Sequence, residues 1–439
     1  MKINENLGFQ IPSILLPKRD LDFQKWAVIA CDQYTSEPEY WHDVETFVGD
    51  APSTLKMVLP EVYLETDFEN ELIERTKKNM QDYLDQDIFQ SLEGLILVER
   101  QTENNKRHGV MVALDLEKYD FNKGSQTLIR ASEGTILDRL PPRIRIREGA
   151  KLEFPHILVL IDDPNYTVIE PLVEKKDQFR KIYDFDLMKK SGHLTGYLVP
   201  SDNELKQFVE AIENLAKPER FYQHYQVDKK FGVLLFAMGD GNHSLATAKS
   251  IWEEIKDKVS MDHPARYALV EIENIHDQGL EFEPIHRVLF NLQLDILEKM
   301  KTWWGESLRV SPSLSQAEMI EQVDHQSPSV HKIGFINPHG YFVLEIKNPE
   351  SNLPVGTLQP FLDSFMKQKG AGKIDYVHGW KVTCELGKKE NNCGYYLPAM
   401  EKDQLFKTII VDGALPRKTF SMGEADEKRF YMEGRKITP

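Results

Sequence analysis

Residues 231–249 read FGVLLFAMGDGNHSLATAK and predict a buried strand, a tight polar turn and a helix in direct succession. The apolar run from Phe231 to Met238 has the length and composition of a buried strand. From Leu245 to Lys258, apolar residues recur at helical spacing, which predicts an amphipathic helix. We take this strand–turn–helix unit as the centre of the expected fold.

The turn within this unit is dense in polar residues and consists of Gly239, Asp240, Gly241, Asn242, His243 and Ser244. The first N–H groups of a helix lack partners within the helix and lie at the positive end of its dipole, so such a junction can bind phosphate. Asp240 and His243 add a metal-binding or proton-transferring pair at the same place. The alternative is turn chemistry alone, in which the glycines permit the turn and Asn242 or Ser244 caps the helix.

The composition bounds the class of protein. The chain has 439 residues, of which 41% are hydrophobic and 28% charged, and this length suggests two or three domains. No stretch approaches the roughly 20 apolar residues of a membrane span, and the first residues lack a signal-peptide pattern. The three cysteines form no CxxC pair and predict no disulfide framework. A cytoplasmic protein with a small-molecule ligand is expected.

Strands are expected to alternate with helices through residues 24–290, beginning with a buried strand at Trp26–Cys31. This alternation predicts an α/β to α+β fold with mixed sheets and flanking helices. Beyond it, helices lead into a hairpin whose turn is the Pro-His-Gly sequence at 338–340. Two domains are therefore expected: an α/β main region over 1–290 that holds the ligand site, and a C-terminal α+β region over 291–439.

A second strand-to-helix junction is expected at Cys31–Tyr34. Ser36 and Glu39 have the spacing of a capping box for the helix that follows. Asp32 and Tyr34 are candidate substrate-binding residues at this junction. The alternative for Asp32 is a structural one, in which its carboxylate only orients the turn.

Residues 130–147 form a second dense constellation, with five arginines in an otherwise acidic protein. A proline pair at 141–142 is expected to prevent a long helix. The alternation from Arg143 to Arg147 predicts a strand with one polar face, so most of these arginines are interpreted as partners of surface carboxylates. Glu133 and Arg139 have a predicted functional role, since a carboxylate can accept a proton and an arginine can bind phosphate bidentately.

A further pair of candidates follows the strand expected at 267–275. His286 and Arg287 are predicted to lie at the start of a helix, where they are candidate substrate-binding residues. A histidine that serves the core or caps the helix is the alternative for His286.

Several short motifs, taken in order, resemble those of the uncharacterised prokaryotic family known as domain of unknown function 1015. They cover nearly the whole chain and are Ala30–Tyr34, Glu133–Thr135, Asp138-Arg139, Gly239–Ser244, Pro284–Arg287 and Leu415–Thr419. The family's usual Asp-Gly-His-His-Arg turn is similar to a turn in free-serine kinases of the ParB-like/sulfiredoxin superfamily, where it lies at the phosphates of a nucleotide. The resemblance therefore implies a ParB/sulfiredoxin-like nucleotide-site element, with phosphoryl transfer or nucleotide hydrolysis as its chemistry.

This chain departs from the family's turn in its histidine and arginine positions. Asn242 replaces the first histidine, and Ser244 replaces the arginine, so a charge that would hold phosphate is missing. An arginine from residues 130–147 would have to take its place.

The leading hypothesis is a kinase-type, nucleotide-dependent phosphotransferase that acts on a small hydroxyl-bearing metabolite, with ATP or ADP and Mg²⁺ as cofactors. The residues expected to bind the nucleotide are Gly239, Gly241, Asn242, Ser244 and Arg139. Asp240 would coordinate Mg²⁺ or accept the hydroxyl proton, and His243 would donate to the transferring group. Glu133 is the alternative general base.

Two other classes of function stay open. A non-catalytic sensor of a nucleotide or metabolite would use the same turn without turnover. A DNA-binding regulator, which the ParB likeness suggests, is disfavoured by the net charge of −16 and by the lack of a basic recognition helix. The sequence holds no P-loop and no G-x-G-x-x-G, so a nucleotide site must use another arrangement. The oligomeric state is not predicted.

Overall fold

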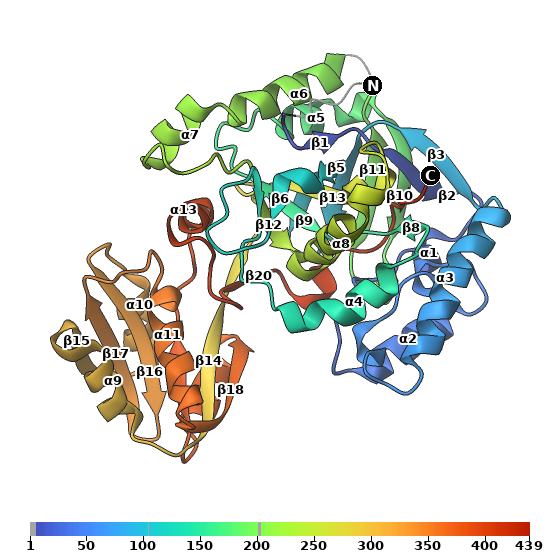
Figure 1. Ribbon diagram of the computed structural model, residues 1–439. Helices are drawn as coiled ribbons and strands as arrows, with labels where there is room; N and C mark the ends of the chain where they lie inside the picture. The colour runs from blue at the N-terminus through green and yellow to red at the C-terminus, as the bar shows by residue number, and fades with distance from the viewer. Residues whose placement is uncertain (1–5, 104, 201–202) are drawn as a thin grey trace. The chain divides into compact units, whose positions relative to one another are not determined.

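The computed structural model describes residues 6–103, 105–200 and 203–439 (Figure 1). Helices and several sheets are mixed in it, which confirms the expected architecture. The chain divides into two compact units, the first comprising 1–281 with 423–439 and the second 282–422. The expected division at residue 290 assigned 423–439 to the second region, whereas the structure groups this C-terminal segment with the first unit, to which it is hydrogen-bonded.

The first unit is built on a long mixed sheet. Its strands in spatial order are β10 (Arg180–Asp186), β11 (His193–Leu198), β4 (Ile96–Gln101), β5 (Lys106–Asp115), β13 (Tyr267–Asn274), β9 (Leu158–Ile161), β12 (Phe236–Asp240), β7 (Ile129–Arg130) and β6 (Tyr119–Asp120), with β1 (Phe9–Gln10) also paired to β5. β9 and β13 are parallel, whereas β12 is antiparallel to β9 and places Asp240 opposite Leu158. The turn after β12 therefore lies beside the first residue of β9, at the end of the sheet where β9 begins.

A hydrophobic core fills each face of this sheet, because successive side chains of a strand point to opposite faces. One core joins Val110 and Val112 of β5 to α6 (Asn203–Leu215) and α8 (Asn242–Ile255). The other joins Met111 to Trp26 and Trp41. The remaining elements of the unit are α1 (Phe23–Trp26), α2 (Pro38–Val48), α3 (Glu69–Asp85), α4 (Leu140–Arg147), α5 (Glu170–Lys175), α7 (Pro218–Tyr225) and the strand pairs β2 (Ser13–Pro17) with β3 (Phe89–Glu93) and β8 (Leu152–Glu153) with β21 (Arg435–Lys436).

The C-terminal segment, residues 423–439, is held in the second core by buried polar contacts. The guanidinium of Arg429 is 4% exposed and lies 2.7 Å from Glu271 and 2.6 Å from Glu433. The indole N–H of Trp26 donates to the carbonyl of Met432 at 3.2 Å. The last residues of the chain are thus part of the framework of the first unit.

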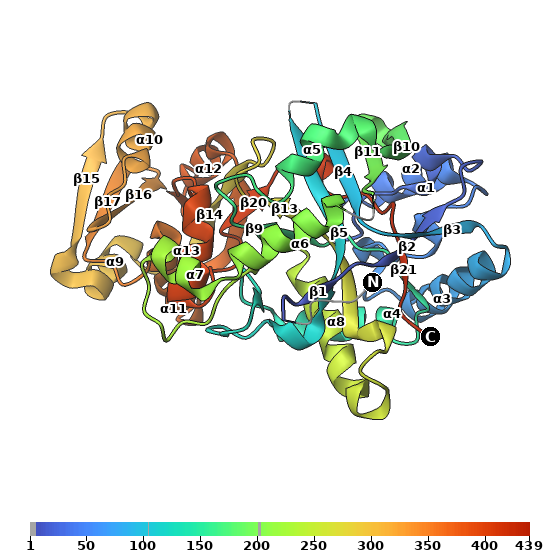
Figure 2. The same ribbon diagram turned by 90° about the horizontal axis from the view of Figure 1, so that it is seen from above.

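The second unit is an α+β unit around its own sheet. The strand order is β15 (Leu308–Ser313), β17 (Gly340–Lys347), β16 (Val330–Asn337), β19 (Cys393–Tyr396), β14 (Phe282–Leu292) and β18 (Ala371–His378), with β20 (Phe420–Met422) also paired to β14. Its helices are α9 (Ile296–Trp304), α10 (Gln316–Asp324), α11 (Pro354–Lys367), α12 (Trp380–Gly387) and α13 (Lys402–Asp412). Figure 2 shows β15, β17 and β16 side by side, with α10 packed beside them.

Three local expectations are wrong. The strand expected at 26–31 is an extended segment after α1 with an isolated bridge between Ile29 and Phe430, because its partner comes from the far end of the chain. The strand expected at 143–147 is the helix α4, whose prolines occupy the first turn, where a missing N–H costs no hydrogen bond. Finally, α2 begins after Glu37 with no side-chain cap, and Pro38 rather than the expected capping box marks its start.

The contacts of Arg429 predict a large loss of stability in Arg429→Ala. This change leaves the carboxylates of Glu271 and Glu433 buried without their cation, which should cost about 3–5 kcal/mol. The free energy of unfolding from urea titration measures the effect. Lys436→Ala, at an exposed position of the same segment, is the matched control and should cost no more than about 0.5 kcal/mol. Equal losses in the two variants would contradict the role given to Arg429.

Candidate functional site

The turn between β12 and α8 has a backbone that only glycine adopts easily. Gly241 is the N-cap of α8 and has φ of +81°. A Cβ atom at this position would lie 3.1 Å from the Cα atom of Ile157, which begins the approach to β9. Position 241 therefore requires glycine for two reasons: the positive φ angle, and the backbone of Ile157 that lies against it.

The helix that starts at this turn has no side-chain cap among the described residues. Asn242 and Ser244, the predicted caps, point to other partners. The N–H of Ser132 donates to Oδ1 of Asn242 at 3.2 Å, and the amide of Asn242 donates to Ser132 Oγ at 3.2 Å. Ser244 Oγ lies 3.2 Å from Nε2 of His156. The start of α8 is therefore not capped by either of the two predicted side chains.

The arginine-rich segment 130–147 contacts the turn through residues near its start. Besides the contacts of Ser132, the N–H of Ile136 donates to Nε2 of His243 at 3.3 Å. This bond makes Nε2 an acceptor, so the hydrogen of the neutral imidazole is on Nδ1. Glu133 lies half-buried between these two contact points, and Arg139 is exposed.

The arginines of α4 are used in ion pairs, as the sequence indicated for most of them. Arg143 pairs with Glu61, Arg145 with Glu69, and Arg147 with Glu153. Arg130 is buried and donates to the carbonyl of Gly232 at 2.6 Å. Among these arginines, none is paired with a residue of the turn in the part of the chain that the structure describes.

The cation at the turn is a lysine that the sequence did not suggest. Nζ of Lys428 lies 3.3 Å from Oδ2 of Asp240, and the N–H of Gly241 donates to Oδ1 of Asp240 at 2.8 Å. Burial opposes ionisation of this carboxyl, but the charges of Lys428 and His156 outweigh it and hold the pKa of Asp240 below its usual range. No local motif marks Lys428, because the C-terminal segment brings it to the turn from the other end of the chain.

His156 connects the turn to the second predicted junction. Its Nε2 lies 3.6 Å from Oδ2 of Asp32, and its Nδ1 lies 2.9 Å from the hydroxyl of Tyr431. That hydroxyl also accepts the N–H of Cys31 at 2.9 Å. Asp32 is therefore placed beside the turn, through two residues that the sequence did not single out. Tyr34 has φ of +52°, and its ring stacks on that of Tyr40 at 3.8 Å.

His286 and Arg287 lie inside strand β14 of the second unit, not at the start of a helix. Strands pair with β14 on both sides, which explains why this segment is extended. Both side chains are buried, and Arg287 donates to Gln359 at 3.1 Å and to the carbonyl of Arg417 at 3.1 Å. Burial lowers the pKa of His286 to about 3, with Arg287 and His378 adding to the shift, so this imidazole is neutral. These contacts favour a structural role for the pair, the alternative that the sequence left open for His286.

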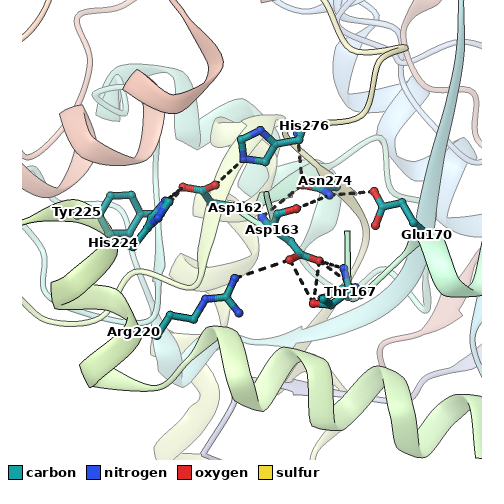
Figure 3. Close-up of polar contacts among 10 residues, drawn as sticks. Asp162, Asp163, Thr167, Glu170, Arg220, His224, Tyr225, Asn274 and His276 are labelled. Carbon is teal, nitrogen blue, oxygen red and sulfur yellow. Dashed lines mark hydrogen bonds and ion pairs between the residues drawn. The ribbon is translucent and has the colours of Figure 1, made fainter. Parts of the chain in front are cut away.

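A separate polar cluster (Figure 3) lies where the parallel strands β9 and β13 end. The turn lies at the other end of β9. Asp162 accepts hydrogen bonds from the hydroxyl of Tyr225 at 2.6 Å and faces Nε2 of His276 at 2.7 Å and of His224 at 3.1 Å. Although Asp162 is buried, these partners hold its pKa below the usual range. Because they also fill its acceptor positions, the cluster ties α7 to the sheet.

The described ranges contain neither a metal-binding cluster nor a membrane-spanning helix. No group of three or more His, Cys, Asp or Glu side chains is arranged there to hold a metal ion. No helix in those ranges has the length and apolar character needed to cross a bilayer.

Comparison with known proteins gives one family and several distant structures. The family model described as "Protein of unknown function (DUF1015)" matches residues 15–365, and no curated protein matches the chain. A mutant of free serine kinase in complex with AMP shares 10% identity at a TM-score of 0.40, covering 75% of this chain and 92% of that one. A conserved hypothetical protein from Pyrococcus furiosus shares 11% identity at a TM-score of 0.37, with 75% and 95% covered. SbnI from Staphylococcus aureus, truncated at its C-terminus, shares 9% sequence identity at a TM-score of 0.35. The match covers 71% of this chain and 82% of that one.

The ion pair at the turn predicts a pH-dependent effect of Lys428→Met, which removes the ammonium group and keeps the bulk of the side chain. The lowered pKa of Asp240 contributes stability above the unfolded-state pKa of about 3.9 and loses that contribution as pH falls through the folded-state pKa. The difference in unfolding free energy between wild type and variant should therefore be largest above about pH 4 and shrink below it. Urea titrations across this range measure it, and a difference independent of pH would contradict the pairing.

Proposed function

The chain belongs to the family described as protein of unknown function (DUF1015), and we propose that it is a nucleotide-dependent phosphotransferase acting on a small hydroxyl-bearing molecule. The observation that carries the proposal is the N-terminus of α8, which no side chain of the described residues caps, with Asp240 and Lys428 beside it. Backbone N–H groups and a buried ammonium group together form the kind of site that binds the phosphates of a nucleotide.

Lys428 supplies the positive charge that the turn itself lacks. The family's turn carries an arginine where this chain has Ser244, and the charge of Lys428 stands next to the same turn. Lysine binds phosphate as a point charge, so it can replace arginine where bidentate geometry is not needed. Arg139 is exposed and would have to approach the nucleotide from outside.

Asp240 has the chemistry that Mg²⁺ requires, since Mg²⁺ is bound by one or two carboxylates together with the phosphates of a substrate. Its lowered pKa keeps it ionised as a hard oxygen donor. Bound there, Mg²⁺ would supply charge neutralisation for the phosphates. The ion pair with Lys428 means that metal and lysine would share this carboxylate, and a carboxylate with a low pKa is a weak base. Asp240 is therefore a poor proton acceptor, and this role falls to another residue, of which Glu133 is the one that the sequence offered.

We assign to His243 the role of donor to the transferring group, and one hydrogen bond of its ring supports this role. Its Nε2 accepts the N–H of Ile136, so the imidazole presents its hydrogen at Nδ1. A donor fixed in this way needs no reorganisation when negative charge develops on the transferring phosphoryl group. Phosphoryl transfer passes through a loose transition state, so positioning and charge stabilisation of this kind supply most of the rate.

A non-catalytic sensor is the second candidate function. The observation that favours it is the low pKa of Asp240, which suits a binding carboxylate better than a base. Nucleotide binding is common to both candidates, and turnover with an acceptor separates them.

Thermal unfolding against ATP, ADP, CTP and GTP, with and without Mg²⁺, tests the site. A nucleotide at a hundred times its dissociation constant should stabilise the wild type by about 2.7 kcal/mol. Asp240→Asn and His243→Ala should lose this stabilisation, whereas Asp257→Asn, at an exposed position just after α8, should keep it. A stabilisation that persists in both site variants, or its absence from the wild type, would contradict the proposal.

A further inference from the structure

A cavity of about 140 Å³ opens beside the turn, within the first unit. Ser244 and Thr247 of α8 form one wall, and His156 and Tyr431 form part of another. α4, which lies next to α8 (Figure 1), contributes a third wall. The cavity therefore shares Ser244 and His156 with the candidate phosphate site, and a molecule inside it would lie next to a bound nucleotide.

The volume of the cavity limits the size of its occupant. An apolar cavity of roughly 150 Å³ holds a molecule the size of benzene, which has about six non-hydrogen atoms. A sugar phosphate or a nucleoside exceeds this size and would extend out of the cavity. We therefore take a compact molecule as the occupant that fits it.

The walls of the cavity are largely apolar. The side chains that make them so are Val58, Leu59, Leu64, Ile146, Phe154 and Ile157. Ligand sites of this composition bind the hydrocarbon part of a molecule and fix its orientation through a few polar groups. Here the polar groups at the turn are Ser244 Oγ and His156 Nε2, 3.2 Å apart.

The charged side chains that line the cavity already form ion pairs. Arg143 pairs with Glu61, and Arg147 lies 2.5 Å from Glu153, which Arg435 also contacts at 2.8 Å. Burial raises the pKa of Glu61 despite the charge of Arg143, with Asp32 adding to the rise, so this environment disfavours additional negative charge. A charged occupant would have to compete with these existing ion pairs, whereas an uncharged one leaves them intact.

We propose that this cavity is the acceptor site and that the acceptor is an uncharged aliphatic alcohol of about six non-hydrogen atoms. The apolar walls hold its carbon body, and its hydroxyl faces Ser244 and His156 at the turn. The alcohol oxygen forms a bond to the γ-phosphorus of ATP, and the bond from that phosphorus to the β–γ bridging oxygen breaks. ADP leaves with the electron pair of that bond, and the hydroxyl proton passes to the imidazole of His156, which lines the cavity. The role of the alcohol as phosphoryl acceptor rests on the proposed function. Its binding in the cavity does not depend on that function.

Saturation-transfer NMR with 3-methylbutan-1-ol as the probe tests the cavity, with 3-hydroxybutyrate as the charged comparison and octan-1-ol as the oversized one. The wild type should bind 3-methylbutan-1-ol at least tenfold more tightly than either comparison. Ile146→Phe, which fills the cavity from α4, should weaken this binding about tenfold through lost contacts and space. Ile144→Phe is the matched control, because Ile144 lies on the same helix and is not among the described residues that line the cavity. It should bind as the wild type does.

Each outcome separates the cavity from the nucleotide site. Tighter binding of 3-hydroxybutyrate, or equal binding in Ile146→Phe and wild type, overturns the assignment of the cavity even where ATP still stabilises the protein. Conversely, alcohol binding without any stabilisation by nucleotide overturns the acceptor role and leaves the cavity a ligand site. Phosphorylation of 3-methylbutan-1-ol by ATP, followed by ³¹P NMR and lost in Ile146→Phe but not in Ile144→Phe, is the result expected when both proposals hold.

Discussion

The contact on which the site most depends is the buried guanidinium of Arg429 between Glu271 and Glu433. Three ionised groups removed from water are tolerable only when each has a partner, so this arrangement fixes the C-terminal segment in one position. The residue before Arg429 is Lys428, and two residues after it stands Tyr431. The same contact thereby delivers the ammonium group to Asp240 and the hydroxyl to His156.

The turn at 239–244 shows which features of the candidate site can be predicted from sequence and which cannot. A strand, a glycine turn and a helix were predicted from spacing and apolar periodicity, which are local properties, and each is present with shifted bounds. The strand β12 covers Phe236–Asp240 instead of 231–238, and α8 begins at Asn242 instead of Leu245, so that only Gly241 separates them. The contact of residues 132–136 with the turn could not be predicted from sequence, since it depends on how two distant segments pack. Lys428 and His156 were missed for the same reason, because nothing in their neighbouring residues marks them as partners of Asp240.

The wrong predictions have a common physical cause. Trp26–Cys31 has the composition of a strand, but its bonds go to the C-terminal segment, so tertiary contacts override local preference. Arg143–Arg147 alternates like a strand, yet a helix with prolines in its first turn allows three arginines to reach three carboxylates. His286 and Arg287 were expected at the start of a helix and instead lie inside β14, where their polar atoms bond to backbone groups of Leu397 and Arg417.

The central claim is that the phosphates of a nucleotide bind at the start of α8 beside Lys428. A crystal structure of the protein with ADP and Mg²⁺ tests it most directly. We expect a phosphate within hydrogen-bonding distance, about 2.7–3.2 Å, of backbone N–H groups in the first turn of α8 and of Nζ of Lys428. A nucleotide bound elsewhere, with the pair of Asp240 and Lys428 unchanged and no phosphate at the turn, would contradict the claim.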